Sequence, residues 1–467
     1  MRKTKIICTL GPASDGAEMM RKLISAGADV FRINMSHADP GHVRELVPQI
    51  RRIADECRRA VAILMDTQGP AIRTGDVKTD LHLKRGDILE LTVRGATSEE
   101  AYSVDVNYPD LLNDVKAGDT MLVDNGVIRL LVLEKGADRI RCKVLTPGTL
   151  GSRRHINLPG VRVNLPPLTP KDIADVKLGA ELAVDYVALS FVRQPKDLDQ
   201  LRDLLSQNGS RAKVMAKIED HCAVEAIEAI IQSADAIMVA RGDLGIEVPY
   251  EELPIIQRRI VKLCARLGKP VVVATHMLES MIHNPLPTRA EVTDVANAVF
   301  EQADAIMLSG ETSIGAYPEE CVRVFDRVAL RIERSGGAGY AENAQLEDVR
   351  QKTVASAVLL ANSLKRGSMI VFTRHGTMAR NASNLRPRRA PIFAFTPDEQ
   401  VRQQLALSWG IYPVRIGFCD DPNATIEAAE AYLREHKLTK TGDNLVIVSD
   451  VLAGERRVDT VQLRTAR

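Results

Sequence analysis

KVMAKIE at residues 213–219 and AIMVARGD at residues 236–243 are short apolar runs that each end in charged residues. Continuous apolar runs of this length are typical of strands that are buried on both faces in a parallel sheet. Because side chains two residues apart on a strand point to the same side, Lys217 and Glu219 are predicted to project together. Six more runs of this kind occur in the chain, at residues 5–10, 29–34, 61–66, 186–191, 270–276 and 305–311.

The segments between most of these runs have the periodicity of amphipathic helices, as residues 41–59 and 251–267 show. Eight strand and helix alternations predict a (β/α)8 TIM barrel. Active sites of such barrels lie at the carboxyl ends of the strands. Polar residues are predicted at those ends: Asn34, Ser36, Asp66, Lys217, Glu219, Asp243, Thr275 and Glu311.

The alternation is interrupted between about residues 70 and 166, where short strand-like runs and turns replace helical periodicity. Asp124-Asn125-Gly126 between two apolar runs is a strong hairpin signal. We predict a small all-β domain, inserted after strand 3 at residues 70–166. The catalytic barrel would then comprise residues 1–69 and 167–334.

A glycine-rich connector, SGGAG at residues 335–339, follows the predicted barrel. Beyond it, apolar runs alternate with helical segments, which predicts a C-terminal open α/β domain at residues 345–467. Its expected strands are residues 369–373, 392–395, 412–416 and 444–449, and its expected helices are residues 352–363, 377–385, 399–407 and 424–436.

The bulk composition excludes several classes of protein. With 62 Lys and Arg against 61 Asp and Glu, the net charge of +1 gives no reason to expect a nucleic acid or an anionic membrane as partner. No uncharged apolar stretch reaches the roughly 20 residues that span a bilayer, and the first residues have no apolar signal core. None of the seven cysteines forms a Cys-x-x-Cys pair, which favours a reducing cytoplasm.

Two clusters of strand-end residues indicate chemistry. Glu219 and Asp243 from adjacent strands offer oxygen ligands for Mg²⁺, and Lys217 beside them suits a transferring phosphoryl group or an enolate. A Lys-x-Glu pair alone is more often a structural ion pair. Arg32 matches two phosphate oxygens. The hard oxygens of a further set suit a monovalent cation, although ordinary strand-end hydrogen bonding is the alternative: Asn34, Ser36, Asp66 and Thr67.

The turn Gly242-Asp243-Leu244-Gly245 follows a strand and is predicted to start a short helix. Its backbone N–H groups are suited to a carboxylate or phosphate, although most Gly-x-x-Gly turns are structural. The sequence has no Gly-x-x-x-x-Gly-Lys-Ser/Thr motif, so a nucleotide would be bound without a P-loop.

Several motifs together resemble those of pyruvate kinases, in the same order and over nearly the whole chain. They are TKIICTLGPAS (4–14), RINMSH (32–37), DTQGP (66–70), IRTG (72–75), NLPG (157–160), KIE (217–219), MVARGDLG (238–245), ATHMLESM (274–281), NP (284–285), PTRAE (287–291), DVANA (294–298) and MLSGET (307–312).

This resemblance implies an enzyme of glycolysis that transfers the phosphoryl group of phosphoenolpyruvate to ADP, giving pyruvate and ATP. It implies that Arg32 and Lys217 contact the phosphoryl group, that Glu219 and Asp243 ligate Mg²⁺, and that a second Mg²⁺ arrives with ADP. The resemblance further implies that the substrate carboxylate is bound by Gly242, Asp243 and Thr275, and that Thr275 lies near the face where the enolate is protonated. It implies that K⁺ is bound by Asn34, Ser36, Asp66 and Thr67. It also implies that the nucleotide contacts Asn34, His37, Arg73 and Arg154.

The resemblance also implies a lid, regulation and a homotetramer. The inserted domain would close over the site and exclude water. A phosphorylated small-molecule effector would bind the loop Thr373-Arg374-His375-Gly376-Thr377 at a helix N-terminus and a second loop that includes Arg456; solvated loops are the alternative. The sequence departs from the family pattern at Ala71, where an acid accompanies K⁺ dependence or a lysine replaces the ion.

Two other functions fit parts of the pattern. A lyase or aldolase of 2-oxo acids would share a phosphoenolpyruvate- or pyruvate-binding barrel but lacks the β insertion and the IRTG segment. A non-catalytic phosphoenolpyruvate sensor would share the fold, but the presence of Arg32, Lys217, Glu219, Asp243 and Thr275 argues against it.

Overall fold

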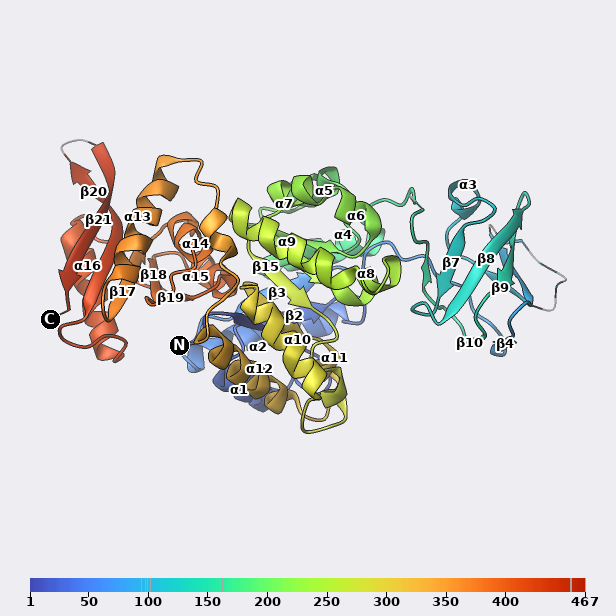
Figure 1. Ribbon diagram of the computed structural model, residues 1–467, viewed down its shortest axis with the longest axis horizontal. Helices are drawn as coiled ribbons and strands as arrows, with labels where there is room; N and C mark the ends of the chain where they lie inside the picture. The colour runs from blue at the N-terminus through green and yellow to red at the C-terminus, as the bar shows by residue number, and fades with distance from the viewer. Residues whose placement is uncertain are drawn as a thin grey trace.

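The computed structural model describes residues 1–93, 95–96, 98, 100, 102–161, 163–453 and 456–466, with only the backbone described for residues 450–453 and 456–457. Three parts follow one another along the long axis of the molecule (Figure 1). A helix-covered barrel lies in the middle, a β-rich part lies at one end and an α/β part with the C-terminus lies at the other.

Eight parallel strands close the central barrel in the order β1-β16-β15-β14-β13-β12-β3-β2, which confirms the predicted fold class. Each strand is short and fully or almost fully buried, as continuous apolar runs predict. The strands are β1 (Lys5–Thr9), β2 (Val30–Asn34), β3 (Ala62–Asp66), β12 (Tyr186–Leu189), β13 (Lys213–Ile218), β14 (Ala236–Ala240), β15 (Val271–Ala274) and β16 (Ala305–Leu308).

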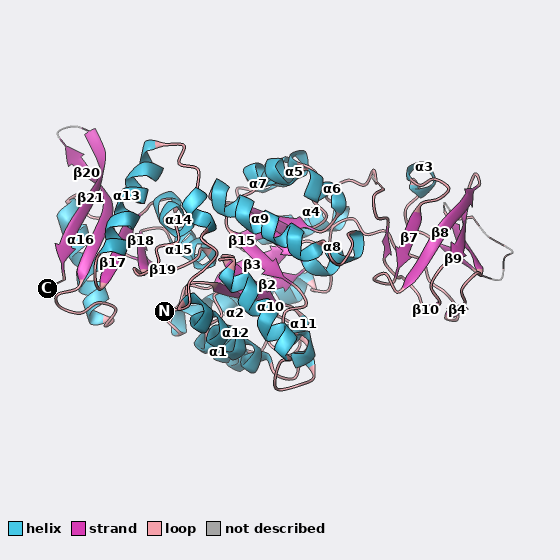
Figure 2. Cartoon of the chain, viewed as in Figure 1, coloured by secondary structure: helices cyan, strands magenta, loops and turns pink. Residues whose placement is uncertain are grey.

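Helices surround this barrel, and Figure 2 shows them as a layer outside the strands. Their apolar faces pack against the outer faces of the strands in one large core. The longer helices are α1 (Ala17–Ala26), α2 (Pro40–Glu56), α4 (Pro170–Glu181), α5 (Pro195–Gln207), α9 (Leu253–Leu267), α10 (Arg289–Phe300) and α12 (Pro318–Glu333); the shorter ones are α6 (His221–Glu225), α7 (Ile227–Ser233), α8 (Arg241–Glu247), η1 (Glu279–Ile282) and α11 (Gly310–Ser313).

Several strands end earlier than the sequence predicts. The apolar run 236–243 was expected to give way to a short helix at the turn 242–245, but β14 already ends at Ala240 and α8 begins at the next residue. In the same way β16 ends at Leu308, and α11 carries Glu311. Some residues of these helical turns are still buried, as Leu244 of α8 and Glu311 of α11 are, so burial does not end where the strand ends.

The inserted part follows β3 and consists of a six-stranded sheet in the order β11-β7-β8-β9-β5-β6 and a two-stranded sheet, β10-β4. Asp124, Asn125 and Gly126 all have positive φ, as the predicted hairpin turn requires. The elements are β4 (Leu81–Leu83), β5 (Ile88–Thr92), β6 (Ser103–Asp105), α3 (Leu111–Asp114), β7 (Thr120–Val123), β8 (Ile128–Lys135), β9 (Arg139–Val144), β10 (Gly148–Leu150) and β11 (Ile156–Asn157).

The C-terminal part is an α/β sheet in the order β19-β18-β17-β20-β21. β21 is antiparallel to β20 and was not predicted from the sequence. The elements are η2 (Tyr340–Asn343), α13 (Val349–Ser363), β17 (Gly367–Phe372), α14 (Thr377–Asn384), β18 (Ile392–Thr396), α15 (Glu399–Gln404), η3 (Leu405–Leu407), β19 (Ile411–Arg415), α16 (Pro422–Glu435), β20 (Asn444–Ala453) and β21 (Arg456–Thr465). Among the described residues, no helix has the length and apolar character needed to span a bilayer.

Candidate active site

A cleft of about 400 Å³ lies where the carboxyl ends of the barrel strands face the inserted part. Residues of both parts line it. The barrel contributes Arg32, Asn34, Ser36, Thr67, Gln68, Ser190, Phe191, Lys217, Glu219 and Asp243, and the inserted segment contributes Ala71, Arg73, Asp124, Asn125, Ser152, Arg153, Arg154 and His155.

Lys217 is almost completely buried near the end of β13, and its ammonium group contacts three partners at the cleft. Nζ lies 2.8 Å from Oε1 of Glu219 and 3.2 Å from Oδ1 of Asp66, and it donates to Oγ of Ser190 at 2.7 Å. Burial disfavours the ammonium ion, but the two carboxylates outweigh it and raise the pKa of Lys217 above its ordinary value. A fixed positive charge therefore stands at the cleft.

Arg32 is the second buried cation of the site. Its Nε donates to Oδ2 of Asp66 at 2.7 Å, and its Nη1 donates to Oγ1 of Thr9 at 3.0 Å. Burial would raise the pKa of Asp66, but Lys217 and Arg32 lower it below its ordinary value. Asp66 on β3 thus holds Arg32 of the adjacent strand β2 and Lys217 of β13 in fixed positions, which preorganises positive charge for an anionic substrate.

Glu219 and Asp243 both line the cleft, as the predicted metal ligands must. Burial raises the pKa of Glu219 to about 7; Lys217 opposes this shift and the Asp243 charge adds to it. Oε2 of Glu219 accepts a hydrogen bond from the Phe191 N–H at 2.7 Å. Two carboxylates that line the same cleft, one of them buried, suit a divalent cation with oxygen ligands. Across the described residues, no group of three or more His, Cys, Asp or Glu side chains is arranged as a metal site.

The residues predicted to bind a monovalent cation are only partly brought together at the cleft. Asn34, Ser36 and Thr67 line it, with Ala71 on the same wall. Asp66 is fully buried behind them and holds Arg32 and Lys217. The cleft therefore offers the amide of Asn34 and the hydroxyls of Ser36 and Thr67 as oxygen ligands, whereas the Asp66 carboxylate already pairs with Arg32 and Lys217.

Thr275 lies after β15 in an unusual turn, in which Thr275 and His276 have φ values of 68° and 53°. The N–H of Gly242, in the first turn of α8, donates to Oγ1 of Thr275 at 2.7 Å. The structure thus brings Thr275 and the Gly242–Asp243 pair together, from neighbouring strands, beside the cleft.

Of the four residues predicted to contact a nucleotide, Asn34, Arg73 and Arg154 line the cleft and His37 does not. Arg73 donates to the Arg153 carbonyl at 3.1 Å, and Arg154 lies 3.3 Å from the Asp124 carboxylate. Both arginines line the cleft, as does Asn34. His37 is exposed in the turn after β2 and is not among the lining residues.

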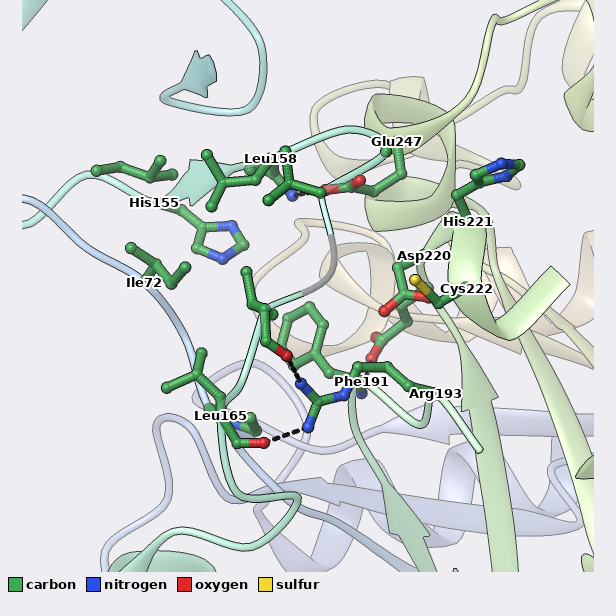
Figure 3. A pocket seen from close by; sticks show the side chains of 17 residues that line it. Ile72, His155, Leu158, Leu165, Phe191, Arg193, Asp220, His221, Cys222 and Glu247 are labelled. Atoms are coloured by element: carbon green, nitrogen blue, oxygen red, sulfur yellow. Dashed lines mark hydrogen bonds between the residues drawn. The ribbon is translucent and has the colours of Figure 1, made fainter. Parts of the chain in front are cut away.

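A smaller pocket beside the cleft shows how the inserted part is attached to the barrel (Figure 3). Arg193, from the loop after β12, donates to the carbonyl oxygens of Val163 and Leu165 in the returning segment, as the dashed lines show. On the other side of the pocket, Nδ2 of Asn157 donates to Oε1 of Glu247 at 3.0 Å. Burial raises the pKa of Glu247 to about 7.

The predicted effector loop lies between β17 and α14. Arg374, His375 and Thr377 are exposed, whereas Thr373 and Gly376 are buried and Gly376 has a φ of 81°. Arg380, which was not predicted, reaches back to the loop and donates to the His375 carbonyl at 3.2 Å. The side chain of Arg456, from the second predicted loop, lies outside the described residues.

Sequence reasoning missed Ser190 and Arg241. Oγ of Ser190 accepts a hydrogen bond from Lys217 and donates one to the Thr67 carbonyl. Arg241 is buried and donates to the Thr275 carbonyl. Neither is marked by spacing, because a serine after an apolar run and an arginine before a glycine are both common. Their contacts follow from the strand order, since β12 lies between β13 and β3 and β14 lies beside β15.

Buried cations and two carboxylates at the strand ends of a barrel suit an anionic substrate. Residues 1–322 match the family described as "Pyruvate kinase, barrel domain", and residues 351–463 match "Pyruvate kinase, alpha/beta domain". The chain belongs to the pyruvate kinase family.

Individual proteins similar to this chain are also pyruvate kinases. The chain is 39% identical to pyruvate kinase 2 of Synechocystis sp. over 97% of its own length and 77% of the relative. It is 41% identical to the plastidial pyruvate kinase 3 of Arabidopsis thaliana, covering 99% and 82% of the two chains. The crystal structure of a pyruvate kinase from Cryptosporidium parvum superposes with a TM-score of 0.95 at 35% identity, covering 100% and 96%.

Proposed function

We propose that this enzyme transfers the phosphoryl group of phosphoenolpyruvate to ADP in the cleft between the barrel and the inserted part. The observation that carries the proposal is the Lys217 ammonium, held between Asp66 and Glu219 at the cleft. A charged lysine that is fixed by two carboxylates can stabilise a transferring phosphoryl group without reorganising during the reaction.

In the proposed reaction, a β-phosphate oxygen of ADP attacks the phosphorus atom of phosphoenolpyruvate, and the bond from phosphorus to the enol oxygen breaks. Arg32 and Lys217 face the charge on the phosphoryl oxygens, which the planar guanidinium and the ammonium can both bind. The enolate that leaves takes a proton at C3 to become pyruvate. Thr275, beside Gly242, is proposed to lie at the face that receives this proton.

Glu219 and Asp243 are proposed to hold Mg²⁺, which when bound would neutralise charge on the substrate oxygens. The raised pKa of Glu219 supports this, because burial disfavours the ionised carboxylate and a bound cation would stabilise it. Pyruvate kinases in general use a divalent and a monovalent cation. We propose that K⁺ lies beside Asn34, Ser36, Asp66 and Thr67, and that the nucleotide lies along Arg73 and Arg154, with Asn34 and His37 near it.

The inserted part, residues 70–166, is proposed to act as a lid. It supplies Arg73, Asp124, Arg153, Arg154 and His155 to the cleft wall. In the pocket of Figure 3 its polar contacts with the barrel include the Asn157–Glu247 and Arg193–Val163 hydrogen bonds, which would have to persist or rearrange as the lid moves. Closing it would exclude water, which otherwise competes with ADP as phosphoryl acceptor.

The C-terminal part, residues 345–467, is proposed to bind a phosphorylated effector at the loop 373–377. Thr377 opens α14, whose N-terminal N–H groups favour an anion, and Arg374 and Arg380 flank the loop. A homotetramer is proposed from the family resemblance, together with the exposed apolar side chains of Val349 and Leu359 on α13. All seven cysteines are free, which supports a reducing cytoplasm as its location.

The test is steady-state formation of ATP and pyruvate from phosphoenolpyruvate and ADP, with Mg²⁺ and K⁺ varied independently. Equal amounts of both products, abolished by a chelator of divalent ions, are expected. Binding of phosphoenolpyruvate with no ATP formed would favour the sensor, and consumption of pyruvate or phosphoenolpyruvate without ADP would favour a lyase.

A further inference from the structure

Arg241 is buried at the start of α8, immediately before Gly242 and Asp243. Ala240 of β14 and Ala274 of β15 are partners in the barrel register, so Arg241 and Thr275 are the first residues beyond two paired positions. Each follows directly from its strand. The backbone of Arg241 therefore lies next to the turn that follows β15.

The guanidinium group of Arg241 spans that turn. It donates through Nε to the Ala274 carbonyl at 3.3 Å and through Nη2 to the Thr275 carbonyl at 2.7 Å, and the His276 carbonyl lies 3.4 Å from Nη2. Thr275 and His276 both have positive φ, a conformation that non-glycine residues adopt only when their surroundings impose it. The donor fork meets three consecutive carbonyl oxygens and so supplies that constraint.

The far side of the guanidinium is anchored as well. Nη1 lies 2.7 Å from Oδ1 of Asp294 on α10, and 3.4 Å from Oε1 of Gln257 on α9. Gln257 in turn donates to the buried Glu301 at 3.0 Å. The planar group is therefore fixed between two outer helices on one side and the strained turn on the other.

We infer that Arg241, anchored by Asp294, is a positioning residue that holds the Thr275–His276 turn against α8, so that Oγ1 of Thr275 meets the Gly242 N–H. The inference rests on the proposed function for its catalytic consequence, since Thr275 and Gly242 are the proposed contacts to the substrate. The geometric part stands without it. Arg241 itself does not line the cleft and acts through the two residues it aligns.

A lysine at position 241 keeps the charge and can pair with Asp294, but its single ammonium cannot match three carbonyl oxygens and a carboxylate in one plane. In Arg241→Lys, kcat is expected to fall roughly 10- to 100-fold, the scale of a small misplacement of a catalytic group. The KM for phosphoenolpyruvate is expected to change less, because Gly242 stays on α8. Asp294→Asn removes only the anchor and is expected to have an intermediate effect.

The matched control is Arg386→Lys. Arg386 and Asp304 form another buried arginine–carboxylate pair, 2.7 Å apart, and Asp304 immediately precedes β16, at the opposite end of the barrel from the cleft. If Arg241→Lys lost activity through general destabilisation alone, Arg386→Lys would lose it too. Positioning predicts that Arg386→Lys keeps the unmutated kcat and that only Arg241→Lys loses it.

Amide hydrogen exchange gives a readout that needs no turnover. In the unmutated protein the Gly242 amide bonds to Thr275 and the Leu278 amide bonds to Glu311 at 3.0 Å. Both amides are expected to exchange at least ten times faster in Arg241→Lys and at the unmutated rate in Arg386→Lys. Unchanged exchange in Arg241→Lys would overturn the inference. Faster exchange in an enzyme that forms no ATP even unmutated would support the positioning role and reject the proposed function instead.

Discussion

Replacing Glu219 with glutamine should stabilise the protein at alkaline pH while it damages the site. Burial raises the pKa of Glu219 from 4.5 to about 7 in the folded state. A carboxyl group that binds its proton more tightly when folded contributes most to stability below its unfolded pKa, and this contribution is lost as the pH rises toward 7. The shift corresponds to about 3 kcal/mol. Glutamine resembles the protonated acid and leaves Asp66 to pair with Lys217, so the variant should keep that stability at pH 8.

The assay is denaturant unfolding at pH 5 and pH 8 with a chelator of divalent ions present. At pH 5 the two proteins should differ little, because Glu219 is mostly protonated in the folded state. At pH 8 Glu219→Gln should be more stable by up to about 3 kcal/mol. Added Mg²⁺ should stabilise the unmutated protein by mass action and the variant much less, since the variant lacks one of the two proposed ligands.

Glu247 supplies the control. Burial raises its pKa to about 7 as well, yet its partner is Asn157 of the inserted part and it lies outside the proposed ligand pair. Glu247→Gln should therefore also gain stability at pH 8 but keep the full response to Mg²⁺. The reasoning fails if Glu219→Gln is no more stable than the unmutated protein at pH 8, or if Mg²⁺ stabilises both glutamine variants equally.

Three further outcomes follow from the site. Asp243→Asn should raise the Mg²⁺ concentration needed for half activity, and an unchanged Mg²⁺ titration would remove Asp243 from the ligand set. Because Ala71 lines the cleft beside the proposed K⁺ ligands and carries no charge, the enzyme should be activated by K⁺, with tighter K⁺ activation in Ala71→Glu and weaker dependence in Ala71→Lys; full activity with tetramethylammonium as counter-ion would refute this. Thr377→Glu should abolish activation by a sugar phosphate or nucleotide monophosphate through charge repulsion at α14, with basal turnover intact, and a retained response would place the effector elsewhere.

The barrel could be predicted from the sequence because its strands are buried on both faces and so leave continuous apolar runs. The exact points where strands give way to short helices could not, since buried residues continue from the strands into α8 and α11. Asp243 was expected just after a strand, in a turn that starts a short helix, and it lies in the first turn of α8. The prediction that it accompanies Glu219 depended on strand adjacency, which the barrel preserves.

The side chains near the cleft could be predicted by type, but their contacts could not. Lys217 and Glu219 share a strand face by simple alternation, and the structure places them 2.8 Å apart. Asp66 looked like one more oxygen donor for a cation, whereas it is buried between Arg32 and Lys217. Arg241 carried no signal, because its partners come from the next strand and from two helices distant in the sequence.

The central claim is that the Lys217 charge stabilises the transferring phosphoryl group, and the turnover number of Lys217→Met tests it most directly. Losing one preorganised electrostatic group should lower kcat by roughly 10²-fold or more, with a smaller effect on phosphoenolpyruvate binding. Lys5→Met is the control, since Lys5 is also a buried lysine, at the opposite end of the barrel, where it donates to the Ile411 carbonyl. The account predicts that kcat collapses in Lys217→Met and persists in Lys5→Met; a near-normal kcat in Lys217→Met would contradict it.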